Sequence, residues 1–530
     1  MERDDDGVLN RLLPAQAERR PDDPWIHCDG KTWTFGAVAE RVERFAAGWA
    51  EIGVGPGTRV ALLLENSADY VFLVLALIRL GALHTPLNTA FRGSYLRGIL
   101  ATLRPEVLVV GDLFLDGALA ALPGSGVNRL VTVGCDPASL TGVRELDGIG
   151  STAAEQLAAA AGPAPSADVT PGAPASVFLT SGTTGRSKGV LLSHACWYAG
   201  IEVTSTGRDV RPDDVFYLCT PMFHAAAWTL NLWTSLRVGA PVVLDRWFSV
   251  EGFWPTVRRY GVTQVCTLGP MHHWLWSQAR RADDDDNPAR VWTAVPMPAD
   301  LWLPFTERFG LQAVVSMYGQ TEVMPATMGD ACRPAKPGSS GRPQPGLELR
   351  IVDDAGAPLP TGETGEIVIR PRRPHAMFEG YLGDPGSGAG PDGWFHTGDL
   401  GRVDDDGDLF FVDRKADHIR RRGHNVSSAE IEAAVGSHPA VADVAAYAVA
   451  AAEAEDEVMI TVVPRPGTPL DVAELLRFCA DRLPPYALPR YVDTAAGLPR
   501  TATGKVEKYR LRERGVTPTT VDTGAGHHGP

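Results

Sequence analysis

One polar segment bracketed by two apolar runs constrains this chain most. Residues 180–189 read TSGTTGRSKG, and the flanking runs at 175–179 and 190–194 have the composition of buried strands. Glycines let the backbone adopt a positive φ and approach a ligand closely, while hydroxyls and free backbone amides point at an anion. Lys188 and Arg186 add positive charge. The segment therefore predicts a loop between two strands that holds a polyphosphate.

The spacing differs from that of a Walker loop, which requires Gly, about four residues and then Gly-Lys-Ser/Thr. Here Lys188 follows Gly185 by three positions and precedes Gly189. The alternative is a surface linker rich in Ser, Thr and Gly. Two strand-like apolar runs do not normally bracket a linker, so the phosphate loop is the favoured interpretation.

Length and charge limit the class of protein. A chain of 530 residues exceeds one ordinary core, so two or more domains are expected. The net charge of −15 argues against general binding to nucleic acid or anionic membranes. The seven cysteines are widely spaced and lack a C-x-x-C pair, which favours reduced thiols and a cytoplasmic protein. The acidic N-terminus lacks the apolar core of a secretion signal, and the apolar run at 71–78 is too short to span a membrane.

Strand-like and helix-like segments alternate through the first two thirds of the chain. A hairpin is expected over 24–35 around Asp29-Gly30, with Thr34 capping the next helix. Strands are expected at 59–64 and 107–110, and an apolar helix at 69–80 lies between them. This alternation predicts an α/β fold with parallel sheets and crossover helices.

The pattern changes from Gly346 onward. Short β runs at 347–352, 365–370 and 409–412 predict a β-rich subdomain over about 346–413, which completes an N-terminal domain of residues 1–413. Residues 414–515 predict a small α+β C-terminal domain, a usual domain size. Residues 516–530 lack apolar periodicity and are expected to form a flexible tail.

Three further motifs follow the phosphate segment. The run YGQTE at 318–322 comes after the apolar run 311–315, so a strand is expected to deliver a loop bearing an aromatic ring, a hydroxyl and a carboxylate. The run TGD at 397–399 precedes Arg414, and the run PRTATGK at 499–505 ends on a lysine. Singly, each has an ordinary alternative: a polar strand end, a β-turn aspartate or a solvated lysine.

Taken in order, the four motifs resemble those of the adenylate-forming superfamily, which includes acyl-CoA synthetases, adenylation domains of peptide synthetases and luciferases. The resemblance implies that Tyr318 stacks on adenine, that Thr321 contacts the α-phosphate of ATP and that Glu322 holds Mg²⁺. A carboxylate suits this hard cation. It also implies that Asp399 binds the ribose hydroxyls, with Arg414 as a second ribose contact.

The resemblance further implies that Lys505 bridges the substrate carboxylate and the α-phosphate, where a cation stabilises developing charge. The family's small C-terminal domain is mobile and rotates between two half-reactions. The catalytic residues implied are Lys505, Thr321, Glu322 and His224. The nucleotide-binding residues implied are Thr180, Ser181, Gly182, Thr183, Thr184, Gly185, Lys188, Tyr318, Gly319, Gln320, Asp399 and Arg414.

The reaction implied is ATP-dependent activation of a carboxylic acid as an acyl-adenylate, with release of pyrophosphate, followed by transfer to the thiol of CoA. Other acceptors stay open, because relatives also load the phosphopantetheine of a carrier protein. Some similar relatives activate nitrite to diazotise an amine. A catalytically silent nucleotide-binding regulator is a further alternative, which the presence of Lys505, Glu322 and Asp399 disfavours.

The acid is expected to be small or compact. His224 lies in the run PMFH, which matches the segment lining the family's acid pocket, although a packed core histidine is the alternative. Several positions are bulkier than in relatives that act on long acids, and added bulk shortens a pocket. The pocket residues expected are His224, Met271, His272, Val295, Met317 and Met324.

The segment 419–426, IRRRGHNV, resembles the thioester-forming face of CoA ligases, especially carnitine-CoA ligases. Its expected thiol-acceptor residues are Arg422, Gly423 and His424, and its arginines suit CoA phosphates. A solvated basic turn is the alternative. Ala416 stands where relatives often carry Asp or Lys at the hinge, so Asp417 is the alternative hinge residue. A homodimer is compatible with this interpretation.

Overall fold

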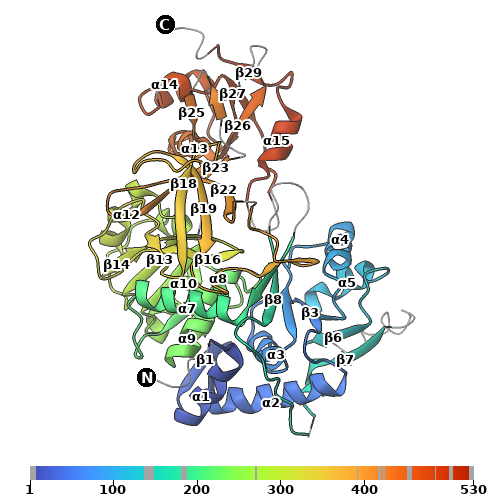
Figure 1. Cartoon of the computed structure of the whole chain (residues 1–530). Helices are drawn as coiled ribbons and strands as arrows, with labels where there is room; N and C mark the ends of the chain where they lie inside the picture. Colours follow the sequence, from blue (N-terminus) through green and yellow to red (C-terminus); the bar gives the residue numbers. More distant parts are fainter. Residues whose placement is uncertain are drawn as a thin grey trace. The chain divides into compact units, whose positions relative to one another are not determined.

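The computed structural model describes residues 7–135, 149–160, 162–180, 188–268, 271–390, 392–415, 419–421, 424–450, 456–483, 485–500 and 505–524 (Figure 1). Two compact units account for the chain. Unit 1 comprises Met1–Leu349, Ile369–Phe395 and Asp406–Phe410; unit 2 comprises Arg350–Val368, His396–Asp405 and Phe411–Pro530. Within the described ranges, no helix has both the length and the apolar character needed to cross a membrane.

Unit 1 contains a nine-stranded sheet in the order β21-β20-β9-β8-β4-β3-β5-β6-β7. Strands β3 to β7 and the pair β4–β8 are parallel, whereas β9 is antiparallel to both β8 and β20. The bounds are β3 (Arg59–Leu63), β4 (Leu83–Pro86), β5 (Val107–Gly111), β6 (Arg129–Val133), β7 (Gly150–Ala153), β8 (Pro174–Leu179), β9 (Gly189–Ser193), β20 (Gly380–Tyr381) and β21 (Asp384–Pro385).

Both faces of this sheet are buried, as expected of parallel strands with crossover helices. Ala61 and Leu63 of β3 share one apolar cluster with Leu100 of α4 and Ala118 of α5, whereas the alternate residue Leu62 is also inaccessible to solvent. The helices between residues 9 and 157 are η1 (Leu9–Arg11), α1 (Leu12–Arg19), α2 (Phe35–Glu51), α3 (Ala68–Arg79), α4 (Gly93–Leu103), η2 (Asp112–Phe114), α5 (Leu115–Ala121) and α6 (Ala154–Leu157). The expected crossover architecture is confirmed.

A second sheet of unit 1 has seven strands in the order β14-β13-β12-β10-β11-β1-β2. All its pairs are parallel except the hairpin β1–β2, which confirms the hairpin expected over 24–35. The bounds are β1 (Pro24–Cys28), β2 (Lys31–Thr34), β10 (Phe216–Leu218), β11 (Val242–Leu244), β12 (Gln264–Leu268), β13 (Val291–Val295) and β14 (Ala313–Val315). The Thr34 hydroxyl caps α2 by accepting from the Ala37 amide, as predicted.

Aromatic side chains fill the layer between this sheet and its helices. Trp292 of β13 packs against Phe253 of α10 and Phe305 of α12. The helices between residues 194 and 308 are α7 (His194–Gly207), α8 (Ala225–Ala227), the π-helical turn η4 (Trp228–Trp233), α9 (Thr234–Val238), α10 (Val250–Tyr260), α11 (Met271–Trp276) and α12 (Ala299–Arg308). Strands β12, β13 and β14 are parallel neighbours. Open α/β sheets bind ligands outside the carboxyl ends of such strands.

The YGQTE segment differs from the expected loop. Its first three residues lie in β15 (Met317–Gln320), which forms a three-stranded sheet with β16 (Val323–Met328) and β17 (Arg342–Pro343). Tyr318 pairs with Thr327, and the register shifts between Tyr318 and Gln320. Thr321 and Glu322 form the turn. Hairpin pairing with the next strand, β16, makes the backbone extended, and Gly319 weakened the strand signal in the sequence.

A four-stranded sheet has the order β18-β19-β22-β23, with bounds β18 (Leu347–Val352), β19 (Gly365–Pro371), β22 (Phe395–Val403) and β23 (Leu409–Arg414). These strands confirm the β-rich character expected after Gly346. The boundary expected between residues 413 and 414 stays a prediction.

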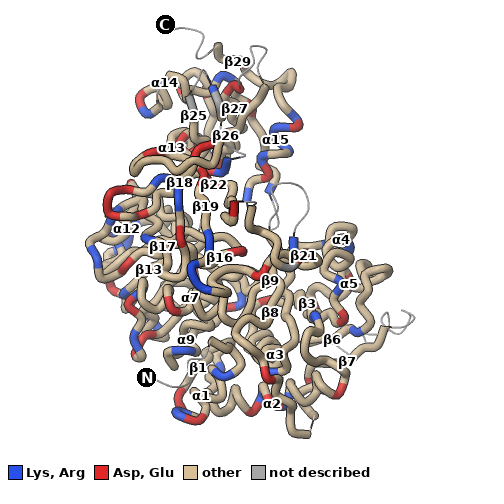
Figure 2. The backbone as a smooth tube through the Cα atoms, viewed as in Figure 1, with Lys and Arg blue, Asp and Glu red and all other residues tan. Residues whose placement is uncertain are grey.

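Unit 2 also contains a small α+β fold, as expected. Strands β26 (Val441–Ala450), β27 (Asp456–Pro464), β28 (Tyr491–Thr494) and β29 (Val521–Asp522) form one sheet, and β24 (Ile419–Arg421) pairs with β25 (His424–Val426). Its helices are α13 (Ser428–Gly436), α14 (Val472–Ala480), η6 (Pro485–Ala487) and α15 (Lys508–Arg514). Ile431, Leu475 and Ile460 share one apolar core. Figure 2 shows the cations of α15 as separate blue stretches along this helix.

One expectation for the C-terminus is wrong. Residues 516–530 were expected to form a flexible tail, but Val521–Asp522 is a strand paired with β28. Arg490 and Asp522 form an ion pair, and the Thr523 amide donates to the Arg490 carbonyl oxygen. A two-residue strand held by polar contacts leaves no apolar periodicity to detect. Residues 525–530 lie outside the described ranges.

Candidate active site

The phosphate segment begins and ends on the hairpin β8–β9. The Thr180 amide donates to the Lys188 carbonyl oxygen at 3.0 Å, and the Lys188 amide donates to Thr180 Oγ1 at 3.2 Å. These bonds close the base of the loop. A Cβ at Gly189 would lie 2.9 Å from a Val177 methyl group, so a side chain there would force a neighbour to shift. The residues between, which include Ser181, Gly182, Thr183, Thr184 and Gly185, lie outside the described ranges.

Glu322 is held in unit 1 by contacts from a distant segment. Its side chain is 7% exposed, and its Oε1 accepts a hydrogen bond of 3.0 Å from the Tyr381 hydroxyl. The Phe378 amide donates to the Glu322 carbonyl oxygen at 2.8 Å. Lys188 Nζ lies 4.6 Å from the centre of the Tyr381 ring. Tyr381 thus contacts both a residue expected to bind metal and the lysine of the phosphate segment.

Tyr381 is a hydrogen-bond donor to Glu322 because it stays protonated. Burial raises the pKa of Tyr381 well above its ordinary value, and the charge of Glu322 raises it further. The Glu322 carboxylate therefore faces a neutral donor. A buried carboxylate with oxygen ligands to offer fits Mg²⁺, which prefers such hard donors.

The TGD motif of unit 2 is built around a glycine with a positive φ in β22. Gly398 has a φ of 69°, a conformation that favours glycine, and its amide donates to Glu366 Oε1 at 3.2 Å. The Thr397 hydroxyl donates to the Ile367 carbonyl oxygen at 2.7 Å and accepts from the Asp399 amide at 3.1 Å. These bonds hold the Asp399 backbone in one position.

Asp399 and Arg414, the two residues expected to contact ribose, form an ion pair. Arg414 Nε lies 2.8 Å from Asp399 Oδ1, and Asp399 is 2% exposed. Nearby, Lys415 Nζ lies 3.0 Å from Glu366 Oε2. Burial raises the pKa of Glu366, but hydrogen bonds from Lys415, His396 and Gly398 outweigh this effect, so its pKa lies below the ordinary value.

Lys505, also in unit 2, is coupled electrostatically to Asp399 and Arg414. Residues 501–504, directly before Lys505, lie outside the described ranges. Directly after it, Val506 forms a β-bridge with Arg500. Lys505 is exposed at the surface, yet surrounding protein atoms partly desolvate its ammonium group. This desolvation lowers the pKa of Lys505, the charge of Arg414 lowers it further, and Asp399 raises it. The coupling connects Lys505 with the expected ribose residues.

The expected acid-pocket residues fall into two clusters of unit 1. Met317 packs with Leu230 of η4 and Cys266 of β12, and Val295 and Met324 lie against the same cluster. Met271 belongs instead to the layer around Trp292 and Phe305. The structure thus brings Met317, Val295 and Met324 together and places Met271 on α11, against α12.

The two expected pocket histidines differ in environment. His272 is fully buried, and its Nδ1 lies 3.3 Å from Thr267 Oγ1. Burial lowers the pKa of His272 to about 3, so the ring is neutral at physiological pH. His224 is half-buried at the start of α8, with its ring 4.7 Å from that of Phe223. His224 is therefore the more accessible of the two.

Most of the expected thiol-acceptor face lies outside the described ranges. This applies to Arg422, Gly423 and the hinge candidates Ala416 and Asp417, whereas the His424 backbone belongs to β25. Arg421, which was grouped with the arginines suited to CoA phosphates, is buried, pairs with Glu457 and donates to the Leu488 carbonyl oxygen. Arg421 is therefore a structural residue, and that expectation was wrong for it.

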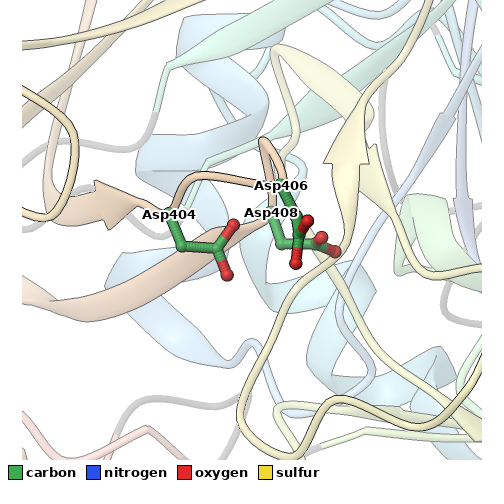
Figure 3. A group of neighbouring side chains, drawn as sticks. All are labelled: Asp404, Asp406 and Asp408. Carbon is green, nitrogen blue, oxygen red and sulfur yellow. The ribbon is translucent and has the colours of Figure 1, made fainter.

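A separate cavity of about 730 Å³ lies in unit 1 and is lined by none of the residues from Tyr318 to Glu322. Asp406 and Asp408 line this cavity. Figure 3 shows them with Asp404 on one acidic turn. Lys336 Nζ lies 2.7 Å from Asp406 and 3.4 Å from Asp408, and Arg342 Nε lies 3.4 Å from Asp408. These cations pair with Asp406 and Asp408, so ion pairs hold this part of the turn.

Two residues of the site were missed by sequence analysis. Tyr381 meets Glu322 across 59 positions of the chain, and Glu366 meets Gly398 across 32. Neither lies in a run whose spacing suggests chemistry. The one local signal is Gly380, whose φ of 112° marks a turn that only glycine adopts readily.

The chain is similar to known adenylate-forming enzymes over nearly its whole length. The family model for the AMP-binding enzyme matches residues 13–382, and that for the AMP-binding enzyme C-terminal domain matches residues 430–505. A crotonobetaine/carnitine–CoA ligase of Salmonella choleraesuis (strain SC-B67) is 30% identical, over 92% of this chain and 94% of the relative.

Solved structures agree with this assignment. ATP-bound MatB from Rhodopseudomonas palustris superposes with a TM-score of 0.82 at 25% identity, covering 95% of this chain and 98% of that one. The anthranilate CoA ligase AuaEII, in complex with anthranoyl-AMP, shares the fold with a TM-score of 0.84 at 23% identity, covering 96% and 97%. The chain therefore belongs to the AMP-binding enzyme family, within the adenylate-forming superfamily.

Proposed function

We propose that this chain activates a small or compact carboxylic acid and that the motif residues described above carry the reaction. The chain is an AMP-forming acid–CoA ligase that uses ATP. One observation of the site carries the proposal. The buried Glu322 carboxylate lies against Tyr381, whose ring also contacts Lys188 at the base of the phosphate loop. A metal-binding carboxylate and a phosphate-binding lysine beside one another suit Mg²⁺ and ATP.

The contacts to the nucleotide are assigned from the four sequence motifs. We assign the adenine contact to Tyr318, with Gly319 and Gln320 on the same strand, and the ribose contact to Asp399 and Arg414. Thr321 contacts the α-phosphate, and Thr180, Lys188 and the intervening loop receive the pyrophosphate. Glu322 would hold Mg²⁺, which when bound neutralises phosphate charge.

The first half-reaction forms the acyl-adenylate. A carboxylate oxygen of the acid attacks the α-phosphorus of ATP, and pyrophosphate leaves with the electron pair of the broken P–O bond. Lys505 stabilises the negative charge that develops on the transferring group, a form of electrostatic catalysis. In the second half-reaction the CoA thiolate attacks the acyl carbon, and AMP leaves.

The size of the acid follows from the cluster that contains Met317. Met317, Met324 and Val295 crowd one region beside η4, and His224 lies at the start of the preceding helix α8. Bulk of this kind shortens a pocket, so we assign a compact acid. The name of the curated relative supports this choice, because it specifies crotonobetaine or carnitine.

The acceptor, the location and the assembly complete the proposal. We assign CoA as the acceptor, with Arg422, Gly423 and His424 at the thiol-acceptor face. The cysteines are free thiols, and most are buried, which suits a reducing cytoplasm. A homodimer is the assembly to be tested by light scattering coupled to size-exclusion chromatography.

Isotope exchange between ATP and pyrophosphate tests the first half-reaction directly. A panel of short aliphatic, aromatic and betaine acids, with nitrite and a long fatty acid as contrasts, should show exchange with compact acids only. Mass spectrometry of the product with CoA, with a carrier protein or with an amine then identifies the acceptor. Exchange with no acid, despite tight ATP binding, would favour a silent nucleotide-binding regulator.

A further inference from the structure

The segment 378–382 joins two elements of unit 1 that the proposed function assigns to metal and phosphate. At one end, the Phe378 amide donates to the Glu322 carbonyl oxygen at 2.8 Å. At the other, the Leu382 amide donates to the Gly189 carbonyl oxygen at 2.7 Å, and Tyr381 pairs with Val190 of β9. One short segment therefore holds both the turn that carries Glu322 and the strand that follows Lys188.

The Tyr381 side chain makes the same connection through its own atoms. Its hydroxyl donates to Glu322 Oε1 at 3.0 Å, and Lys188 Nζ lies 4.6 Å from the centre of its ring. Hydroxyl and ring thus contact two different charged groups, one anionic and one cationic. A substitution can remove the first contact while it keeps the second.

Local structure fixes the direction of this ring. Gly380 adopts a φ of 112°, and a Cβ there would lie 2.5 Å from the Gly386 amide nitrogen, so only glycine permits the tight turn. The Tyr381 amide donates to Ser387 Oγ at 3.2 Å, and the Phe378 ring packs 5.2 Å from the Tyr381 ring. Tyr381 is therefore held by backbone and neighbours before it contacts Glu322.

We infer that Tyr381 is a positioning residue for adenylation: its hydroxyl orients the Glu322 carboxylate for Mg²⁺, and its ring holds the Lys188 ammonium for the phosphates of ATP. This inference rests on the proposed function. A carboxylate with one oxygen engaged has less freedom to rotate, and partners of metal-binding carboxylates typically change metal affinity about 10–100-fold. A cation over an aromatic face is likewise held in place.

Calorimetric titration of Mg²⁺·ATP, and of ATP in the presence of a chelator, separates the two contacts. The ratio of the two affinities measures the advantage that Mg²⁺ confers. Tyr381→Phe should lower this ratio about tenfold or more and leave the affinity for metal-free ATP unchanged, because the ring over Lys188 remains. Tyr381→Leu should lower both affinities. Tyr260→Phe is a matched control, because Tyr260 lies on α10, where its ring faces His27, and it should change neither.

A double-mutant cycle with Glu322→Gln tests whether Tyr381 acts through Glu322. The double variant Glu322→Gln, Tyr381→Phe should lose no more of the magnesium advantage than Glu322→Gln alone. If Glu322→Gln abolishes the advantage and folded Tyr381→Phe keeps the wild-type ratio, the inference fails while the proposed function stands. If the wild-type chain itself shows no magnesium advantage, the assignment of Glu322 and the inference fail together.

Discussion

Arg414 Nε lies 2.8 Å from Asp399 Oδ1, so the two residues expected to bind ribose already contact each other in unit 2. The Asp399 backbone is fixed by Thr397 and by the positive φ of Gly398. A buried carboxylate held on both sides presents its oxygens in fixed directions. The Asp399 side chain therefore has little freedom left to lose when a ribose hydroxyl binds.

Asp399→Ala should weaken ATP and AMP to the same degree, because both ligands carry the ribose. Hydrogen bonds to charged groups contribute about 1.5–3 kcal/mol, which corresponds to an affinity loss of about 10–100-fold. Calorimetry with each nucleotide measures this loss. Asp353→Asn is a control, because Asp353 accepts hydrogen bonds from its own turn between β18 and β19. Unchanged AMP affinity in folded Asp399→Ala would remove Asp399 from the site.

Lys505→Ala should reduce adenylation far more than thioester formation. The charge of Lys505 is assigned to the transition state of the first half-reaction, and loss of one such stabilising group typically costs about 10²–10³-fold in rate. The first rate is measured by pyrophosphate exchange. The second is measured by supplying synthetic acyl-adenylate with CoA. An equal loss in both rates would contradict the role.

The pH dependence of adenylation should also report on Lys505. Partial desolvation and the charge of Arg414 lower the pKa of Lys505, so its ammonium loses its proton at a lower pH than an ordinary lysine. Adenylation should therefore decline as pH rises toward the ordinary lysine pKa of 10.5. Lys505→Arg keeps its charge throughout this range, so its residual exchange rate should lack that decline. The same alkaline decline in both proteins would assign it to another group.

The parts of the fold that local sequence determines were predicted correctly. The hairpin β1–β2 turns at Asp29 and Gly30, which have φ values of 49° and 73°, and this dipeptide is a strong turn signal. Thr34 caps α2 as expected from its position before an apolar helix. In each case the controlling residues are neighbours in the chain.

Features that depend on distant pairing were missed. Val521 lies in a strand because β28 pairs with it. The strand at Tyr318 belongs to a local hairpin with β16 and was missed because Gly319 weakened the strand signal. The contact between Tyr381 and Glu322 joins segments that only the tertiary fold brings together. Of the candidate site, the motifs were visible in the sequence, while the partners that hold Glu322 and Gly398 were not. The roles of the motif residues stay predictions.

Acid should destabilise unit 1 through its buried histidines. Burial lowers the pKa of His84 to about 3 and that of His194 to about 4, below the ordinary value of 6.5. Both rings are neutral in the folded and unfolded chain above pH 6.5. As pH falls from 6.5 to 5, only the unfolded chain takes up protons at these positions. The free energy of unfolding should therefore drop by about 2 kcal/mol for each histidine over this interval.

His84→Phe should remove one share of this acid sensitivity. The His84 ring is fully buried between Phe178 and Trp228, at 5.8 and 5.2 Å between ring centres, so an apolar ring suits the site. Urea unfolding at pH 6.5 and pH 5 measures the change in stability for wild type and variant. The variant should lose about 2 kcal/mol less than wild type. Equal losses would mean that His84 takes up its proton in the folded state.

Met317→Gly should shift the enzyme toward longer or wider acids. Met317 is 4% exposed and packs with Leu230, Val295 and Met324, so its removal opens space in that cluster. Each additional buried methylene of the acid is worth up to ~0.8 kcal/mol, so three methylenes could favour the variant by about 2 kcal/mol, or about 30-fold in kcat/KM. Ordering of the longer acid reduces this gain.

The measurement compares kcat/KM over an acid length series in the two proteins. Val257→Ala is the matched control: Val257 packs in the layer around Trp292, so this variant should lose stability without a change in size preference. If wild type already prefers long fatty acids, or if Met317→Gly keeps the wild-type size profile, then Met317 does not limit the pocket.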